Sequence, residues 1–153
     1  MMEYLEGVKK AKTLEIGELL VQAEGTEVKV NGAVHTIRDM GNVAFVILRK
    51  RDGLVQCVFE EGVTAFDLKE LKEASAVEVL GTIRKEERAA HGIEIRLKEI
   101  KVLSEPDEPL PLPISKWKLN TSLEAKLNMR PISLRNVRER AKFKIQEGLV
   151  RGF

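Results

Sequence analysis

The residues best suited to chemistry lie between His35 and Phe59, a stretch that reads as two strands joined by the tight turn Arg51-Asp52-Gly53. Successive side chains of a strand point to opposite faces of a sheet. Counted from the turn, Phe45 and Gln56 fall on the face opposite the hairpin's apolar rows, and Arg38 lies just upstream. An aromatic ring, an amide and a guanidinium on one outer surface suit an unpaired nucleobase, because the ring stacks on it and the polar groups hydrogen-bond to it.

The inward rows of the same hairpin are apolar and are expected to be buried. The chain's one cysteine falls in such a row, so it cannot form an internal disulfide and is expected to act as a small buried hydrophobe. The two rows are Ala44, Val46 and Leu48 on the first strand, and Val55, Cys57 and Phe59 on the second.

Three further strands flank the hairpin. Apolar and polar residues alternate over 28–34, 76–84 and 93–97, and the last strand continues toward Val102. Gly32 suits a bulge or a sharp bend of the kind that small barrels require. Glu94 has the opposite parity to its apolar neighbours, so it is expected to join the outer surface.

Helical patterns interrupt the strands. Short helices are expected over 2–12 and 15–23, and a further helix from Thr64 to Ala74, with acidic residues near its start. The chain is therefore mainly β. Five strands with a helix between strands 3 and 4 are the element order of a Greek-key barrel of the OB-fold type, whose second and third strands commonly face oligonucleotides.

The C-terminal third reads differently. Four prolines fall within residues 105–113, which predicts a stiff, extended linker. Asn136 and Glu139 have the residue types of a capping box, and an apolar stripe recurs every four residues after it. The helix ends in the middle of this stripe, so we expect the chain to be a fragment. The stripe consists of Val137, Ala141, Ile145, Leu149 and Phe153.

These patterns predict four parts. They are an N-terminal helical segment (1–25), the barrel (26–104), the linker (105–135) and the first helix of a further domain (136–153). Trp117 is expected to pack the linker against a domain.

Composition and charge bound the function. Hydrophobic residues make up 43% of the chain and charged residues 33%, which is typical of a globular protein. The net charge is +2, but it divides unevenly: residues 113–153 carry +7 and residues 1–112 carry −5. Nucleic acid would therefore have to be bound through a local patch. No run is long enough to span a membrane and no signal peptide is visible, so a cytoplasmic protein is the default expectation.

The hairpin resembles the anticodon-binding module of class IIb aminoacyl-tRNA synthetases of the aspartyl type. The resemblance is carried by GAVHTIRDMGNVAFVILRKRDGLVQCVF, by GIEI around Glu94, by the LSEPDEPLPL linker and by KLNMRPISLRNVRERAKFKIQEGLVRGF. It covers about residues 26–153, and the last stretch would lead into the helix of the first class II motif. One departure is Ala33, where the family usually has Trp.

The resemblance implies a role for each outward residue. Phe45 would stack on the middle anticodon base, a uracil, while Gln56 and Arg38 would hydrogen-bond to it or to its neighbours. Glu94 would accept hydrogen bonds from the first base, a guanine. His35 lies where the family varies with tolerance for the Asn anticodon, so the tRNA would be that for Asp, or for both Asp and Asn.

The resemblance also implies the activity of a longer protein. The whole enzyme would be a homodimeric, ATP- and Mg²⁺-dependent aspartate–tRNA ligase. The present chain would supply tRNA affinity and selectivity, would hold no catalytic residue, cofactor or metal, and would be inert alone in aminoacylation. The alternatives are a free-standing OB-fold module that binds single-stranded nucleic acid or tRNA, and an OB-fold used only for protein contacts.

Plainer interpretations stay open for each residue. Arg38 could pair with Asp39 or Asp52, Glu94 could pair with Lys29, and His35 could be an ordinary sheet residue. The hairpin cations are candidate phosphate contacts, although charges crowd turns in any case; they are Arg49, Lys50 and Arg51.

Overall fold

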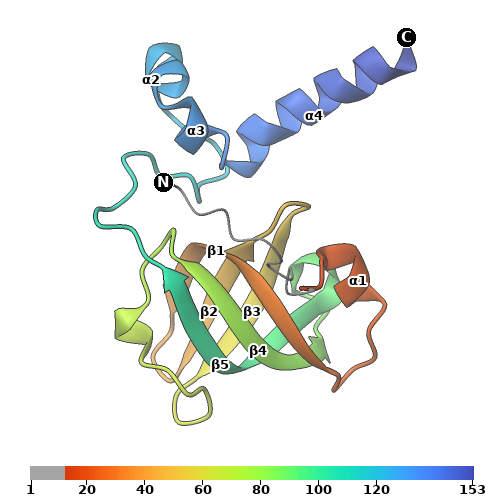
Figure 1. The fold of residues 1–153 in the computed structure, drawn as a ribbon, viewed down its shortest axis with the longest axis vertical. Helices are drawn as coiled ribbons and strands as arrows, with labels where there is room; N and C mark the ends of the chain where they lie inside the picture. The colour runs from red at the N-terminus through yellow and green to blue at the C-terminus, as the bar shows by residue number, and fades with distance from the viewer. Residues whose placement is uncertain (1–12) are drawn as a thin grey trace, which may run out of the picture.

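The computed structural model describes residues 13–153, so the helix expected over 2–12 lies outside the described residues. The expected second helix is present as α1 (Ile16–Leu20), somewhat shorter than its pattern suggested. Glu15 caps it, and Leu19 is fully buried in the barrel core. The helix therefore closes one side of the barrel (Figure 1).

Five strands close into a barrel, as predicted. The spatial order is β1-β2-β3-β5-β4, antiparallel throughout except for the parallel pair β3–β5. Figure 1 shows the strands wrapping around one interior. Their bounds are β1 (Glu27–Asp39), β2 (Val43–Arg49), β3 (Leu54–Glu60), β4 (Ala76–Lys85) and β5 (Ile93–Ser104).

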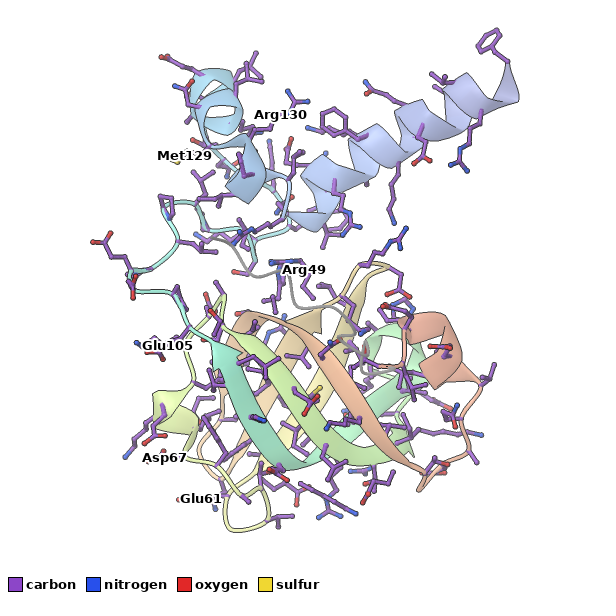
Figure 2. The ribbon with its side chains drawn as sticks, viewed as in Figure 1. Arg49, Glu61, Asp67, Glu105, Met129 and Arg130 are labelled. Carbon is purple, nitrogen blue, oxygen red and sulfur yellow. The ribbon has the colours of Figure 1, made fainter. Side chains whose placement is uncertain are left out.

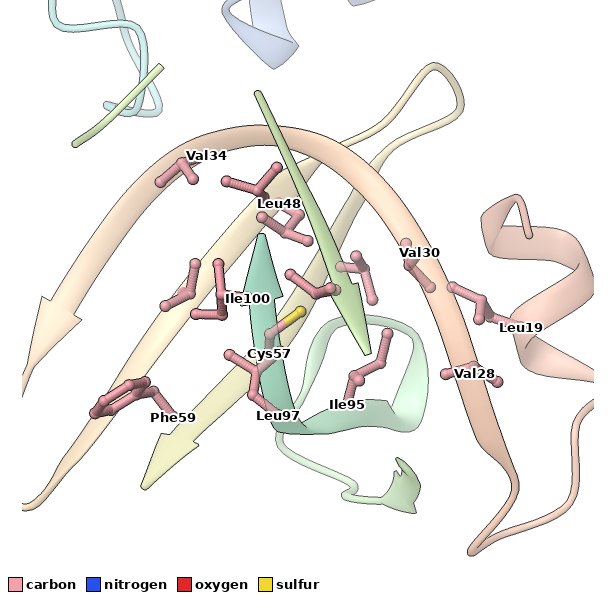
Figure 3. Packing of buried hydrophobic residues seen from close by; sticks show 14 of the residues in the cluster. Leu19, Val28, Val30, Val34, Leu48, Cys57, Phe59, Ile95, Leu97 and Ile100 are labelled. Carbon is pink, nitrogen blue, oxygen red and sulfur yellow. The ribbon is translucent and has the colours of Figure 1, made fainter. Parts of the chain in front are cut away.

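The inward rows of the hairpin form the core, as their alternation predicted (Figure 3). Ala44, Val46, Leu48 and Cys57 have no exposed surface. Complete burial raises the pKa of the Cys57 thiol to about 12, because a thiolate loses its hydration there. Cys57 is thus an inert packing residue, as expected.

β1 is bent so that it pairs with two neighbours. It pairs with β4 over 27–33 and with β2 over 33–39, and the register shifts between Val34 and Thr36. Gly32 precedes the change of partner: a Cβ there would lie 3.1 Å from the Arg49 carbonyl oxygen. The close approach explains the glycine, while the bulge itself falls at His35.

The helix predicted from Thr64 to Ala74 is wrong. The segment contains only η1 (Leu68–Glu70), a single 3₁₀ turn capped by Asp67. Its first residues pair with β5 instead: the Thr64 hydroxyl donates to the Leu97 carbonyl, and the amide of Ala65 donates to the Lys98 carbonyl at 2.8 Å. These contacts with β5 override local helix propensity. A second 3₁₀ turn, η2 (Ala90–Gly92), lies in the β4–β5 loop.

The C-terminal segment, residues 105–153, carries α2 (Leu123–Asn128), α3 (Arg130–Ser133) and α4 (Val137–Gly152). The linker is not merely extended, because Leu112, Ile114 and Leu119 form a small apolar cluster of their own. Trp117 does not pack as predicted: it is 73% exposed, with the Arg138 guanidinium 5.9 Å from the ring centroid.

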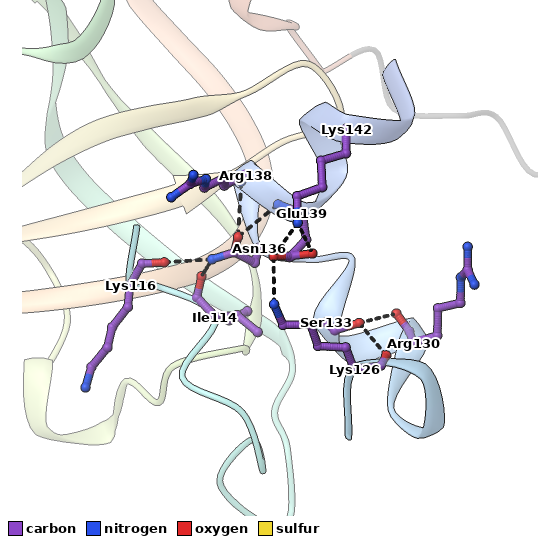
Figure 4. Close-up of polar contacts among 9 residues, drawn as sticks. All are labelled: Ile114, Lys116, Lys126, Arg130, Ser133, Asn136, Arg138, Glu139 and Lys142. Carbon is purple, nitrogen blue, oxygen red and sulfur yellow. Dashed lines mark hydrogen bonds and ion pairs between the residues drawn. The ribbon is translucent and has the colours of Figure 1, made fainter. Parts of the chain in front are cut away.

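Asn136 caps α4, as predicted, but the capping box is incomplete. Its side chain accepts from the amides of Arg138 and Glu139 and donates to the carbonyls of Ile114 and Lys116 (Figure 4). Glu139 instead binds Lys142 and Lys126, which lower the pKa of its carboxyl group. The contact between Lys126 and Glu139 links α2 to α4.

α4 projects away from the barrel and none of its residues is buried (Figure 1). Its predicted stripe is exposed, with Ile145 at 65% and Leu149 at 63%. Among residues 13–153, no helix combines the length and the apolar character needed to cross a bilayer.

Candidate nucleic-acid interface

The strand registers place the predicted base-binding residues on one outer surface. Arg38 lies opposite Phe45 across β1–β2, and Gln56 lies opposite Ile47 across β2–β3. Gln56 also lies opposite Glu94 across the parallel pair β3–β5. Because residues directly opposite one another in neighbouring strands share a face, the ring, the amide, the guanidinium and the carboxylate all belong to the outer surface of the barrel.

The polar half of this surface is organised around Glu94. Gln56 Nε2 donates to Glu94 Oε2 at 3.1 Å, and Arg84 Nη1 lies 3.6 Å from Glu94 Oε1. Glu94 is only 4% exposed, so it is less open than the sequence suggested. A carboxylate has about four acceptor positions, so these two partners leave acceptor capacity for a base. The plainer interpretation of a Lys29 pair is wrong, because Lys29 binds Glu78 at 2.8 Å.

Arg38 is exposed and free to act on a ligand. Within residues 13–153 its side chain has no hydrogen bond or ion pair, and the two carboxylates considered as its partners are engaged elsewhere. Asp39 accepts from the amide of Gly41, and Asp52 accepts from the amide of Ile16.

His35 is buried rather than displayed. It occupies the β1 bulge, is 4% exposed, and its Nδ1 has no hydrogen-bond partner in the described part of the chain. Burial, and then the charge of Arg49, lower the pKa of its imidazole, while Glu73 opposes the shift. The ring is therefore neutral near pH 7.

The three hairpin cations have different surroundings. Lys50 is 7% exposed, and its ammonium donates to the Asn31 carbonyl at 2.9 Å, near Glu15. Its ammonium group is therefore engaged within the barrel. Arg51 is exposed, and Arg49 points toward the C-terminal segment (Figure 2).

Arg84 is the neighbour of the candidate site that sequence reasoning missed. It lies directly opposite Glu94 in the β4–β5 pair. Counting backward and forward from the polar loop at 86–92 would have found it, since antiparallel partners lie at similar distances from their connecting loop. Within the described residues, no group of three or more His, Cys, Asp or Glu side chains is placed to hold a metal ion.

Comparison with known proteins supports the OB-fold and identifies a family of related proteins. Residues 28–103 match the family model of the OB-fold nucleic acid binding domain. The aspartate–tRNA(Asp/Asn) ligase of Saccharolobus solfataricus is 34% identical over 143 residues, which are 93% of this chain and 33% of the ligase. The chain thus spans about a third of the length of this curated relative.

Solved structures with similar folds include tRNA synthetases. Asparaginyl-tRNA synthetase from Pyrococcus horikoshii, complexed with asparaginyl-adenylate, superposes with a TM-score of 0.77 at 26% identity, covering 93% of this chain and 33% of that one. An OBody bound to hen egg-white lysozyme is 30% identical with a TM-score of 0.53, over 65% of this chain and all of its own. Nothing in these similarities favours a free-standing module. The chain belongs to the OB-fold family of tRNA anticodon-binding domains, in the form that aspartate– and asparagine–tRNA ligases carry.

Proposed function

We propose that this chain recognises the anticodon of a tRNA for an aspartate–tRNA ligase of the Asp or Asp/Asn type. The observation that carries the proposal is the shared outer surface of Phe45, Arg38 and the Gln56–Glu94 pair. The complete ligase would use ATP and Mg²⁺ to esterify tRNA in the cytoplasm, and it would do so with residues outside this chain. The chain alone is expected to be inactive in aminoacylation.

Each residue has a part suited to its position. The Phe45 ring stacks on the middle base, and Arg38, directly across the strand pair, hydrogen-bonds to that base or its neighbour. Gln56 gives one amide hydrogen to Glu94, and its carbonyl and second hydrogen stay available to a base. Glu94 accepts from guanine, because a carboxylate matches guanine's donor edge and repels the acceptor edges of other bases.

The stacking role is tested by Phe45→Ala with an anticodon stem-loop RNA carrying GUC. Binding should weaken by about 1–3 kcal/mol, the usual contribution of one base–aromatic stack. Phe143→Ala, which removes an equally large exposed ring from α4, is the matched control and should leave affinity unchanged. A scrambled loop that binds as tightly as GUC would favour a general single-strand binder. No RNA binding at all would favour a protein-contact module.

The carboxylate role is tested by Glu94→Gln. The preference for guanine at the first anticodon position should fall by about 1–3 kcal/mol, since the amide accepts less well and also donates. Glu78→Gln is the control, because it removes a charge from another cross-strand pair of the barrel surface. Unchanged selectivity in Glu94→Gln would remove this residue from the site.

The choice between Asp and Asn tRNAs can be tested by comparing the affinities of two stem-loop RNAs, one with the anticodon GUC and one with GUU. The curated relative is an Asp/Asn ligase by name. We therefore expect the GUC and GUU stem-loops to bind within about tenfold of each other. A larger preference for GUC would assign the chain to an Asp-only ligase.

The exposed stripe of α4 is the surface we propose for a homodimer of the complete ligase. Isolated apolar side chains on surfaces are common, but this stripe is continuous along one helix. The chain should therefore self-associate, and the double variant Ile145→Glu/Leu149→Glu should weaken association at least about tenfold in sedimentation velocity. Val63→Glu/Leu103→Glu, elsewhere on the surface, should not.

A further inference from the structure

A cleft lies where the β2–β3 hairpin meets the first turns of α4. It has a volume of about 160 Å³, which is room for roughly five water molecules or a hydrated phosphate group. One side of it is formed by residues 49–53 and the other by Arg135, Val137, Arg140, Ala141 and Lys144. Arg140 Nη2 donates to the Arg51 carbonyl across it. The cleft therefore joins the barrel to the C-terminal segment.

The charges around this cleft do not balance. Six cationic side chains and one carboxylate line it, and the ammonium of Lys50 is held near Glu15. The carboxylate, Asp52, accepts the amide of Ile16. The other five cations have no ion pair within residues 13–153; they are Arg49, Arg51, Arg135, Arg140 and Lys144.

Arg49 shows the imbalance most clearly. Its Nη1 is buried and has no hydrogen-bond partner among residues 13–153. Burial, followed by the charges of Arg135 and Arg140, lowers the pKa of its guanidinium. A buried donor without an acceptor is costly, and a guanidinium is shaped to bind an oxyanion through two parallel hydrogen bonds. A phosphate oxyanion is therefore a suitable partner for the Arg49 guanidinium.

We propose that this junction cleft binds a backbone phosphate of the same RNA that the barrel surface recognises, and that the phosphate fixes α4 against the hairpin. The proposal rests on the RNA-binding function proposed above. Phe45 and Arg49 project from the same face of β2, four residues apart, which is roughly 13 Å along a strand. An RNA loop on Phe45 can therefore place part of its backbone at the cleft.

The salt dependence of RNA binding tests the cleft. Arg49→Gln and Arg140→Gln should each weaken binding of the GUC stem-loop by about tenfold, and each should flatten the slope of log K against log[KCl] by about 1. Arg140→Lys keeps the charge and should keep the slope. Arg151→Gln removes one charge from the far, exposed end of the same helix, and its affinity should stay within about twofold.

The two proposals fail separately. Preference for GUC over a scrambled loop, with affinity and slope unchanged in Arg49→Gln and Arg140→Gln, would overturn the phosphate site and leave anticodon recognition standing. Loss of slope in both variants without any base preference would support the cleft and overturn anticodon recognition. Phe45→Ala should lower the base preference and leave the slope unchanged.

A second measurement separates RNA phosphate from a free anion. The stem-loop RNA should slow amide hydrogen exchange in the first turns of α4 in the parent chain but not in Arg140→Gln. Inorganic phosphate, compared with chloride at equal ionic strength, should protect these amides less than the RNA does. Equal protection by inorganic phosphate, with RNA affinity untouched in the variants, would assign the cleft to a free anion and overturn the proposal.

Discussion

The barrel and the C-terminal segment hold their apolar residues in opposite ways. Leu48 of β2 has no exposed surface, whereas Leu149 of α4 is 63% exposed. Every strand of the barrel contributes to one continuous core, but no residue of α4 is buried. The barrel is thus stabilised by its own packing, while the contacts of α4 with other elements of residues 13–153 come from its first two turns, as in Lys126–Glu139 and in Phe143 beneath Arg130.

The two regions also differ in their charges. On the barrel surface, cations find carboxylates across strands, as in Lys29–Glu78 at 2.8 Å and Arg96–Glu60 at 2.6 Å. At the junction with α4, Arg49 faces other arginines. This difference is the reason for placing the proposed phosphate at the junction.

The largest expected effect separates the two modes of packing directly. Leu48→Ala should lower the free energy of unfolding by about 2–5 kcal/mol, because it leaves a cavity in a close-packed core. Urea denaturation followed by far-UV circular dichroism measures the change. Leu149→Ala, the same substitution on α4, should cost less than about 0.5 kcal/mol. Equal losses in the two variants would break the contrast between the regions.

The next effect concerns the attachment of α4. Asn136→Ala removes the cap of the helix and leaves the carbonyls of Ile114 and Lys116 without their donor. Caps are worth about 0.5–2 kcal/mol, and the two carbonyls add to that cost. Amide exchange in the first turns of α4 should therefore become at least about tenfold faster, while exchange in the barrel stays unchanged. Faster exchange throughout the chain would show that the two regions unfold together.

Local pattern was sufficient to predict the barrel but not the segment between β3 and β4. The period-two alternation of the hairpin fixed which side chains are inside, because burial of one face determines register. The helix expected from Thr64 failed because the Thr64 hydroxyl and the Ala65 amide bind carbonyls of β5. Those partners lie more than thirty residues along the chain, and propensity does not sense them.

The candidate site was predictable in its composition but not in its exposure. The parity of Phe45, Gln56 and Glu94 gave the correct surface, since alternation determines face. The sequence did not reveal that Arg84 would pair with Glu94, or that a bulge would bury His35. The Arg84–Glu94 pair follows from the equal distance of the two residues from the loop at 86–92, a count that the strand pattern alone does not prompt. The bulge at His35 depends on the pairing of β1 with two neighbours in the closed barrel, which no single strand determines.

The smallest expected effect uses His35, which lies in a cavity wall shared with Ile114 and Asn136 and so belongs to both regions. The pKa of its imidazole in the folded chain is lowered from 6.5. As the pH falls through 6.5, the imidazole therefore becomes protonated in the unfolded chain while it stays neutral in the folded chain. Stability present above pH 6.5 is therefore lost as pH falls toward the folded-state pKa, and no further loss from this group occurs below that pKa.

Urea midpoints measured between about pH 8 and about pH 5 should fall with pH in the parent chain. They should fall equally in His91→Gln, the control at the other, exposed histidine. The slope should be smaller in His35→Gln. An unchanged slope in that variant would mean that the imidazole is already hydrated at the junction, and that the barrel and the C-terminal segment are less closely joined there than its burial indicates.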